Sequence, residues 1–443
     1  MKLRFIALAI CAVLIMTLTA CDGTTTPATP AEKPTTSVQT ETVPLEVEGY
    51  DRVDMSVVEF SNPLYNSVQL TKGYESLTSE KEKKCYELID QYAGYISEEP
   101  KDGFYTIYPV TLYGDVLSEA QLHLVISAYS MDHPQVFWLE SSFAYYSTNT
   151  LTYLQLNSGL SASEIEQEAR AMRKNINDIF SGMPENLRMY DRELYLHDEF
   201  AQRCTYADTS DVQTDKFRVY TSLGGLVDYN AVCEGYSRAM QVLLSLSGIE
   251  TYYVSGVGNE DLHMWNCVNI DGDWYYLDVT WDDNDNGETD YDHFNITTQQ
   301  LLIDHTISPL FWELSEDEIC GGDTNVAVNF NMFIPECDNT SGAFYSQNTV
   351  DVTGFDDENL DRIASRMVSA AYGAEEAVYL YIDPDYLDFD YAVDNLFYSG
   401  DYAIFTCVSR ANEQLTGVQI KENYVSTTES PEFYVVTVYL EYE

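Results

Sequence analysis

A single tight turn constrains the fold of this chain more than any other feature. Asp271-Gly272 is a dipeptide preferred in two-residue β-hairpin turns. It lies between two runs rich in aromatic and β-branched residues, 263–270 and 273–280, which is the composition typical of strands. The sequence therefore predicts a β-hairpin over residues 263–280.

The predicted turn also sets the register of the two strands. If Ile270 faces Asp273 across the turn, counting outward places His263 opposite Thr280. Alternation then puts His263 and Asp278 on one face as diagonal neighbours, roughly 7 Å apart at the backbone and within side-chain reach. A carboxylate at that spacing can hold an imidazole in one tautomer and stabilise its cation.

A helix upstream of the hairpin carries a candidate nucleophile. Apolar residues recur at helical spacing over 231–247, and Gly248 is a plausible C-terminal stop. Cys233 falls in the first turn, where unpaired backbone amides and the helix dipole favour a thiolate. Most cysteines are inert buried residues. The position of Cys233, together with His263 and Asp278, favours a catalytic site instead.

Three motifs in this region together resemble the transglutaminase-like superfamily, and the likeness covers about residues 187–309. The motifs are Val-Cys-Glu-Gly-Tyr at 232–236, His263-x-Trp265-Asn266, and Tyr-Leu-Asp-Val-Thr-Trp-Asp-Asp at 276–283. The resemblance implies an α+β fold with a papain-like core. It also implies that Cys233 is the nucleophile, His263 the general base and acid, and Asp278 the orienting carboxylate.

The resemblance leaves one part of the site unassigned. Many bacterial relatives have Tyr-Gly-Ala-Leu before the cysteine, whereas this chain has Leu-Gly-Gly-Leu at 223–226. The backbone amide of Cys233 is one expected oxyanion donor, and the second is not identified. We expect Trp265 and Trp281 to form pocket walls.

The implied activity is acyl transfer from a peptide or side-chain amide through a cysteine thioester, without a cofactor. Water as acceptor gives a cysteine peptidase or amidase, and a substrate amine gives a transglutaminase. We favour water, since amine transfer needs a second site that excludes water. Nearby carboxylates would suit a lysine ammonium or a basic peptide equally: Glu260, Asp261, Asp282 and Asp283. The alternative is an inactive binding or scaffold module at the cell surface.

The N-terminus resembles a bacterial lipoprotein signal. Residues 1–21 contain basic residues, an apolar stretch too short to span a bilayer comfortably, and a small-residue site before Cys21. We expect Cys21 to be lipidated, the Thr/Pro-rich residues 22–48 to form a tether, and the protein to lie on the extracellular face of the bacterial membrane.

The formal net charge of -51 argues against a nucleic-acid partner, because phosphate binding requires clustered Lys and Arg. The expected partners are a peptide or protein substrate, extracellular or in the cell wall, and the membrane through the lipid. Six cysteines remain after the signal, anchor and nucleophile are set aside, and their wide separation does not resemble a disulfide framework.

The folded part is predicted to comprise three domains. Residues 49–185 form a helical and aromatic accessory domain, 186–314 the catalytic domain, and 315–443 a small α/β domain. The first domain has predicted helices near 79–96, 118–130 and 161–180 and an aromatic hairpin over 143–156. The third has predicted helices over 357–371 and 386–398 and strands over 377–382, 402–408 and 433–442.

An acidic loop resembles the start of a calcium-binding loop. Oxygen-bearing residues alternate over 282–287 with glycine at the sixth position, and Asp290 and Asp292 follow. His293 occupies the place of the closing glutamate and is a poor ligand for a hard cation. A polar connection is the favoured interpretation, and no Cys/His cluster has zinc-ligand spacing.

Overall fold

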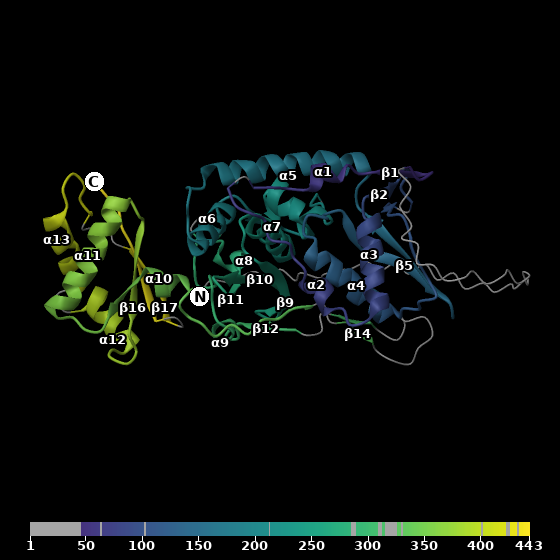
Figure 1. The fold of residues 1–443 in the computed structure, drawn as a ribbon. Helices are drawn as coiled ribbons and strands as arrows, with labels where there is room; N and C mark the ends of the chain where they lie inside the picture. The colour runs from purple at the N-terminus through teal and green to yellow at the C-terminus, as the bar shows by residue number, and fades with distance from the viewer. Residues whose placement is uncertain are drawn as a thin grey trace, which may run out of the picture. The chain divides into compact units, whose positions relative to one another are not determined.

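The structure is a computed structural model that describes residues 46–443 except 63, 102, 212, 285–288, 309–311, 315–325, 329–330, 400–401, 422–425 and 432–433 (Figure 1). The predicted signal peptide, Cys21 and nearly all of the tether lie outside the described residues. In the part of the chain that is described, no helix has both the length and the apolarity needed to cross a membrane.

The chain divides into two compact units. Unit 1 comprises residues up to 289 together with 298–336, and unit 2 comprises 290–297 and 337–443. The predicted accessory segment 49–185 and most of the predicted catalytic segment 186–314 both lie in unit 1. Their separation into two domains stays a prediction. Mixed helix and strand content confirms the α+β class.

The central sheet of unit 1 is antiparallel and has the strand order β11-β10-β9-β12. The strands are β9 (Thr251–Gly258), β10 (Asp261–Ile270), β11 (Asp273–Leu277) and β12 (His305–Ile307). Helix α7 (Cys233–Leu246) packs on β9 and β10, and its buried face supplies much of the core between them. This packing places the first turn of α7 beside the sheet.

The predicted hairpin register is confirmed from Ile270, which pairs with Asp273, as far as Asn266, which pairs with Leu277. The predicted continuation of the second strand to Thr280 is wrong. Asp278 caps a short helix, α8 (Val279–Asp282), by accepting a hydrogen bond from the Thr280 backbone N–H. An aspartate side chain competes well for such an amide, which ends the strand after Leu277.

Three helices of the N-terminal part begin with reciprocal capping boxes, which confirm the predicted helix starts. Ser79 pairs with Glu82, Ser118 with Gln121, and Ser161 with Glu164. The larger elements here are α3 (Glu80–Tyr92), α4 (Glu119–Asp132), β5 (Leu139–Ser147), β6 (Leu151–Ser158), α5 (Ala162–Gly182) and α6 (Met189–Ala201). The predicted aromatic hairpin is the pair β5–β6.

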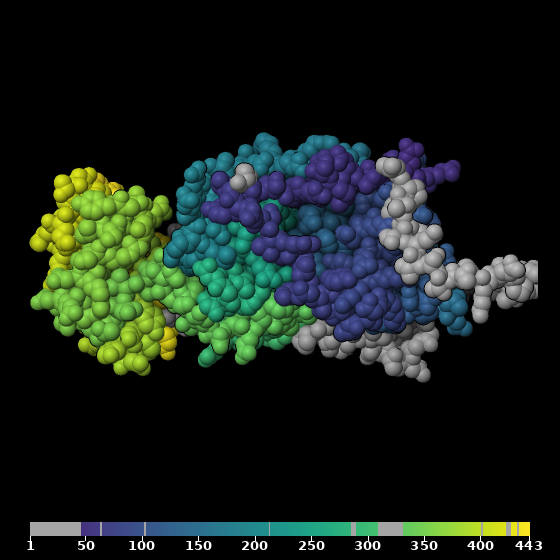
Figure 2. All heavy atoms as spheres, in the orientation of Figure 1, coloured from purple at the N-terminus to yellow at the C-terminus, as the bar shows by residue number. Residues whose placement is uncertain are grey.

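Shorter elements complete unit 1. They are β1 (Tyr50–Arg52), α1 (Met55–Val58), α2 (Lys72–Ser76), β2 (Tyr95–Ser97), β3 (Tyr105–Thr106), β4 (Val110–Tyr113), β7 (Thr205–Tyr206), η1 (Arg218–Tyr220), η2 (Gly224–Asp228), β8 (Asn230–Ala231), α9 (Thr298–Leu301), β13 (Trp312–Leu314) and β14 (Val326–Val328). The segment that follows α1 crosses the outer face of the unit (Figure 2). The backbone N–H of Val68 donates a hydrogen bond to the Ser245 carbonyl, and the Arg192 guanidinium stacks over the Tyr65 ring. These contacts hold the segment in place.

Unit 2 is a four-stranded sheet of order β15-β16-β18-β17 covered by helices. Its elements are α10 (Phe344–Asn348), β15 (Thr349–Val352), α11 (Asp357–Gly373), β16 (Ala377–Ile382), α12 (Phe389–Val393), η3 (Asp394–Tyr398), α13 (Ala403–Gln414), β17 (Ser426–Ser430) and β18 (Val435–Tyr439). The predicted helix over 357–371 and the predicted strand over 377–382 are confirmed.

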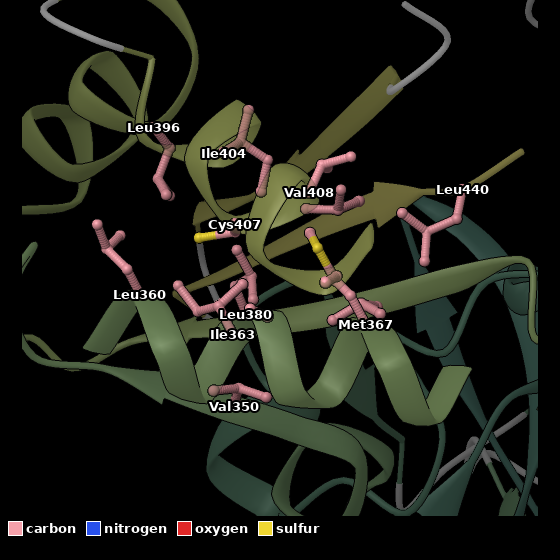
Figure 3. Packing of buried hydrophobic residues seen from close by; sticks show 14 of the residues in the cluster. Val350, Leu360, Ile363, Met367, Leu380, Leu396, Ile404, Cys407, Val408 and Leu440 are labelled. Atoms are coloured by element: carbon pink, nitrogen blue, oxygen red, sulfur yellow. The ribbon is translucent and has the colours of Figure 1, made fainter. Parts of the chain in front are cut away.

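The predicted strand over 402–408 is wrong, because these residues begin α13. Their aromatic and β-branched side chains suggested a strand. Ile404, Cys407 and Val408, with Ala411 one turn further, nevertheless recur at helical spacing and are all buried. Figure 3 shows three of them facing Met367 and Ile363 of α11. Burial of this helical stripe against α11 outweighs the local strand preference.

Candidate active site

Cys233 is the first residue of α7 and follows an extended N-cap residue, Val232. The side chain is partly exposed, whereas the other free cysteines among the described residues are buried: Cys85, Cys204, Cys267, Cys337 and Cys407. Burial raises the pKa of the Cys85, Cys204 and Cys407 thiols to about 12. Accessibility therefore distinguishes Cys233 from every other described cysteine.

The start of α7 is held by a close backbone approach. The Val232 N–H donates to the Val219 carbonyl at 3.0 Å. A Cβ at Gly235 would lie 2.4 Å from the same carbonyl oxygen, so a larger residue would push η1 away. The glycine of the Cys-Glu-Gly-Tyr motif thus allows η1 to pack against the turn that presents the thiol.

His263 and Asp278 form a buried pair. His263 lies on β10 with 7% of its surface exposed, and Asp278 is 2% exposed. The distance from His263 Nε2 to Asp278 Oδ2 is 2.6 Å, while Asp278 Oδ1 accepts the Thr280 N–H at 3.1 Å. With Nε2 turned to the carboxylate, the Nδ1 side of the ring is left for the thiol of Cys233.

Electrostatics favour the ionised form of this pair. Burial opposes charge on His263, but the Asp278 carboxylate and the Cys233 sulfur outweigh it and raise the imidazole pKa to about 10. Burial likewise opposes charge on Asp278, yet His263 and His305 hold its pKa well below the usual range. An imidazolium between a carboxylate and a thiol is the arrangement that a reactive thiolate requires.

Two contacts fix α8, and with it Asp278, to neighbouring helices. Asp282 Oδ2 lies 3.2 Å from His197 Nε2 of α6, and both side chains are fully buried. The Tyr236 hydroxyl of α7 donates to Asp283 Oδ2 at 2.6 Å. The paired aspartates at the start of the acidic loop thus serve as structural acceptors, and residues 285–288 of that loop lie outside the described part.

The remaining motif residues join the hairpin to α7 and cover the imidazole. Asn266 Nδ2 donates to the Ser237 carbonyl at 3.0 Å, which ties β10 to the catalytic helix. Trp265 is fully buried and stacks 5.9 Å from the His263 ring. Trp281 is partly exposed and lies 5.3 Å from the same ring. Of the two tryptophans predicted as pocket walls, only Trp281 reaches the surface.

The sequence interpretation missed Tyr206. This residue lies on β7, which pairs in parallel with β8 so that Tyr206 is opposite Ala231, two residues before Cys233. Burial of the Tyr206 hydroxyl raises its pKa, and the nearby Cys233 thiol raises it further. The backbone N–H of Cys233 also lies close to this hydroxyl. The ring is 51% exposed. A two-residue strand carries no periodic signal, so only the tertiary pairing shows this proximity.

His305 lies outside the three sequence motifs, but it also contacts the site. Its Nε2 lies 3.2 Å from Asp278 Oδ2, the oxygen that His263 contacts. The facing atoms of His263, Asp278 and His305 lie within 4.8 Å of one another, a spacing that could hold a metal ion. The two imidazole–carboxylate contacts account for this spacing without an ion, and no metal enters the chemistry below.

Residues 178–279 match the profile of the Transglutaminase-like superfamily, which confirms the resemblance for this segment. No curated protein matches the chain. A crystal structure described as a TGase is 14% identical over 39% of this chain and 50% of its own, with a TM-score of 0.24. This chain thus covers half of that protein. The structure of a proposed cysteine protease from Cytophaga hutchinsonii is 13% identical, and the match covers 43% of this chain and 70% of that protein, with a TM-score of 0.21.

The buried His197 predicts a pH-dependent stability. Burial disfavours its cation, but Asp198 and Asp282 together raise the pKa to about 9. A folded pKa above the ordinary 6.5 stabilises the fold fully below pH 6.5, and this contribution is lost as pH rises through 9. We expect the free energy of unfolding to fall by on the order of 1–3 kcal/mol across this window.

The measurement is urea unfolding at a series of pH values. His197→Gln retains a donor but not the titration, so its stability should vary less over the same window. His263 is present in both proteins, and the difference between them isolates His197. Identical pH slopes for the two proteins would show that His197 does not carry this charge.

Proposed function

We propose that this protein is a thiol enzyme that cleaves an amide through a thioester on Cys233. The observation that carries the proposal is the buried His263–Asp278 pair beside a partly exposed cysteine at a helix start. Desolvation strengthens the charge interactions within the pair, and the helix start favours the thiolate. The domain match supports the same class of chemistry.

The reaction follows from the positions of these groups. His263 takes the thiol proton, and the Cys233 sulfur attacks the amide carbonyl. The resulting oxyanion faces the Cys233 N–H and the Tyr206 hydroxyl. The carbon–nitrogen bond then breaks, the amine leaves with the proton from His263, and the acyl group stays on sulfur. Water attacks the thioester and gives His263 a proton, which returns to the thiol as the acid departs.

We propose water rather than an amine as the acceptor. Transfer to an amine needs a site that binds the ammonium and excludes water. Two of the four carboxylates that could attract it, Asp282 and Asp283, are engaged by His197 and Tyr236. Glu260, in the turn between β9 and β10, and Asp261, the first residue of β10, are exposed and do not form an enclosed site. We therefore propose a peptidase or amidase acting on a peptide or protein.

Product analysis tests this chemistry. Incubation with acyl-donor peptides and a labelled primary amine, followed by mass spectrometry, should give mainly free acid. Cys233→Ala should lower kcat/KM by at least about 10³-fold, since removing the nucleophile removes the covalent path. Cys407→Ala, which removes a buried thiol of unit 2, is the matched control and should keep full activity.

Two outcomes would contradict the proposal. Amine adduct in excess at millimolar amine would make the protein a transglutaminase while leaving Cys233 as nucleophile. Unchanged turnover in Cys233→Ala would remove the thioester mechanism and leave the alternative of a binding or scaffold module.

Tyr206→Phe tests the second oxyanion donor. Loss of one donor to the developing oxyanion should lower kcat by about 10²- to 10³-fold with little change in KM. Tyr146→Phe, an exposed tyrosine of β5, is the matched control. A Tyr206→Phe enzyme with wild-type kcat would leave only the Cys233 backbone amide in this role.

We also propose that the enzyme is held at the extracellular face of the bacterial membrane by a lipid on Cys21. The sequence pattern at residues 1–21 supports this location, and residues 22–48 would carry the folded units away from the bilayer. Cys21→Ser should move the protein out of the membrane fraction, as judged by immunoblotting of separated fractions. Unchanged partitioning of this variant would require another anchor.

A further inference from the structure

The carboxylate of Asp278 serves two imidazoles rather than one. His263 Nε2 lies 2.6 Å and His305 Nε2 lies 3.2 Å from the same oxygen, Oδ2. The other oxygen accepts the Thr280 N–H. A buried carboxylate needs every available donor, because its charge is costly away from water. His305 therefore contributes one of three donors to a group that must stay ionised.

A second carboxylate contacts the other ring nitrogen of His305. Its Nδ1 lies 2.6 Å from Asp304 Oδ1, so each ring nitrogen faces a carboxylate. The ring is therefore held between two carboxylates, one at each nitrogen. Asp304 is 33% exposed, whereas His305 and Asp278 are buried. The series of contacts from Asp304 through His305 to Asp278 thus begins near solvent and leads inward to the site.

Packing holds the His305 ring in this place. β12 pairs with β9 so that His305 is opposite Gly258, where a Cβ would lie 2.8 Å from Trp281 and 3.2 Å from His263. The ring centroid of His305 lies 4.1 Å from that of Trp281 and 4.9 Å from that of Trp265. The ring has little room to turn away from Asp278.

We propose that His305 is a positioning residue for the thiol chemistry, an inference that rests on the proposed function. It holds Asp278 Oδ2 between two imidazoles, and Asp278 in turn holds the Nδ1 side of His263 toward Cys233. Without His305, the carboxylate keeps its bonds to His263 and Thr280 but can rotate about its side chain. The His263 ring then loses its fixed orientation relative to the sulfur.

The test compares His305→Ala, His305→Gln and the exposed-residue control Thr306→Ala on the same strand. Alkylation of Cys233 by iodoacetamide at pH 7, followed by peptide mass spectrometry, needs no substrate, and kcat and KM are measured on the acyl donor. We expect His305→Ala to lower both the alkylation rate and kcat by about tenfold to a hundredfold at unchanged KM.

The glutamine variant distinguishes hydrogen bonding from packing. His305→Gln keeps a donor for Asp278 and should recover most of the lost rate, and it remains informative if His305→Ala fails to fold. Thr306→Ala should match the wild type. Wild-type rates in His305→Ala, or equal losses in the alanine and glutamine variants, would overturn the proposal.

Failure of the proposed function gives a different result. In that case Cys233 would still alkylate faster in the wild type than in His305→Ala, but no acyl donor would turn over in a Cys233-dependent way. The alkylation rates therefore test the role of His305, and Cys233-dependent turnover tests the proposed enzymatic function.

Discussion

The site depends on one buried carboxylate. Asp278 is almost fully enclosed, so its charge persists only because donors surround it: two imidazoles on one oxygen and a backbone N–H on the other. The same side chain ends β11 and begins α8. A single aspartate thus sets the direction of the chain and the orientation of His263.

The elements around Asp278 are joined by polar contacts from motif residues. Tyr236 ties α7 to α8 through Asp283, and Asn266 ties β10 to α7 through the Ser237 carbonyl. His197 ties α6 to α8 through a buried carboxylate. Because these contacts bridge different elements, a displacement of one element would change the position of the Cys233 thiol relative to His263. This explains why residues without a chemical role occur inside the motifs.

Much of the site could be predicted, because its signals are local. The Asp271-Gly272 turn sets the register correctly as far as Leu277, and the helical stripe places Cys233 in a first turn. The contact between His263 and Asp278 survives even though the second strand ends early, since the cap turns the carboxylate toward the ring.

The other features depend on tertiary pairing. Tyr206 reaches the cysteine through a two-residue parallel strand, and His305 reaches Asp278 from an edge strand that joins β9. Neither pairing leaves a periodic pattern in the sequence. In the segment 402–408 a local signal was present but misleading. Its residues favour a strand, yet they form a helix because one face is buried against α11.

Direct detection of the acyl-enzyme tests the central claim most directly. The enzyme is mixed with an excess of activated acyl donor, quenched with acid within the first turnover, and digested for peptide mass spectrometry. The account predicts an acyl group on the peptide that contains Cys233, formed as fast as the first product is released and lost when water completes the cycle. Product release with no acyl group on Cys233, or an acyl group on another residue, would contradict it.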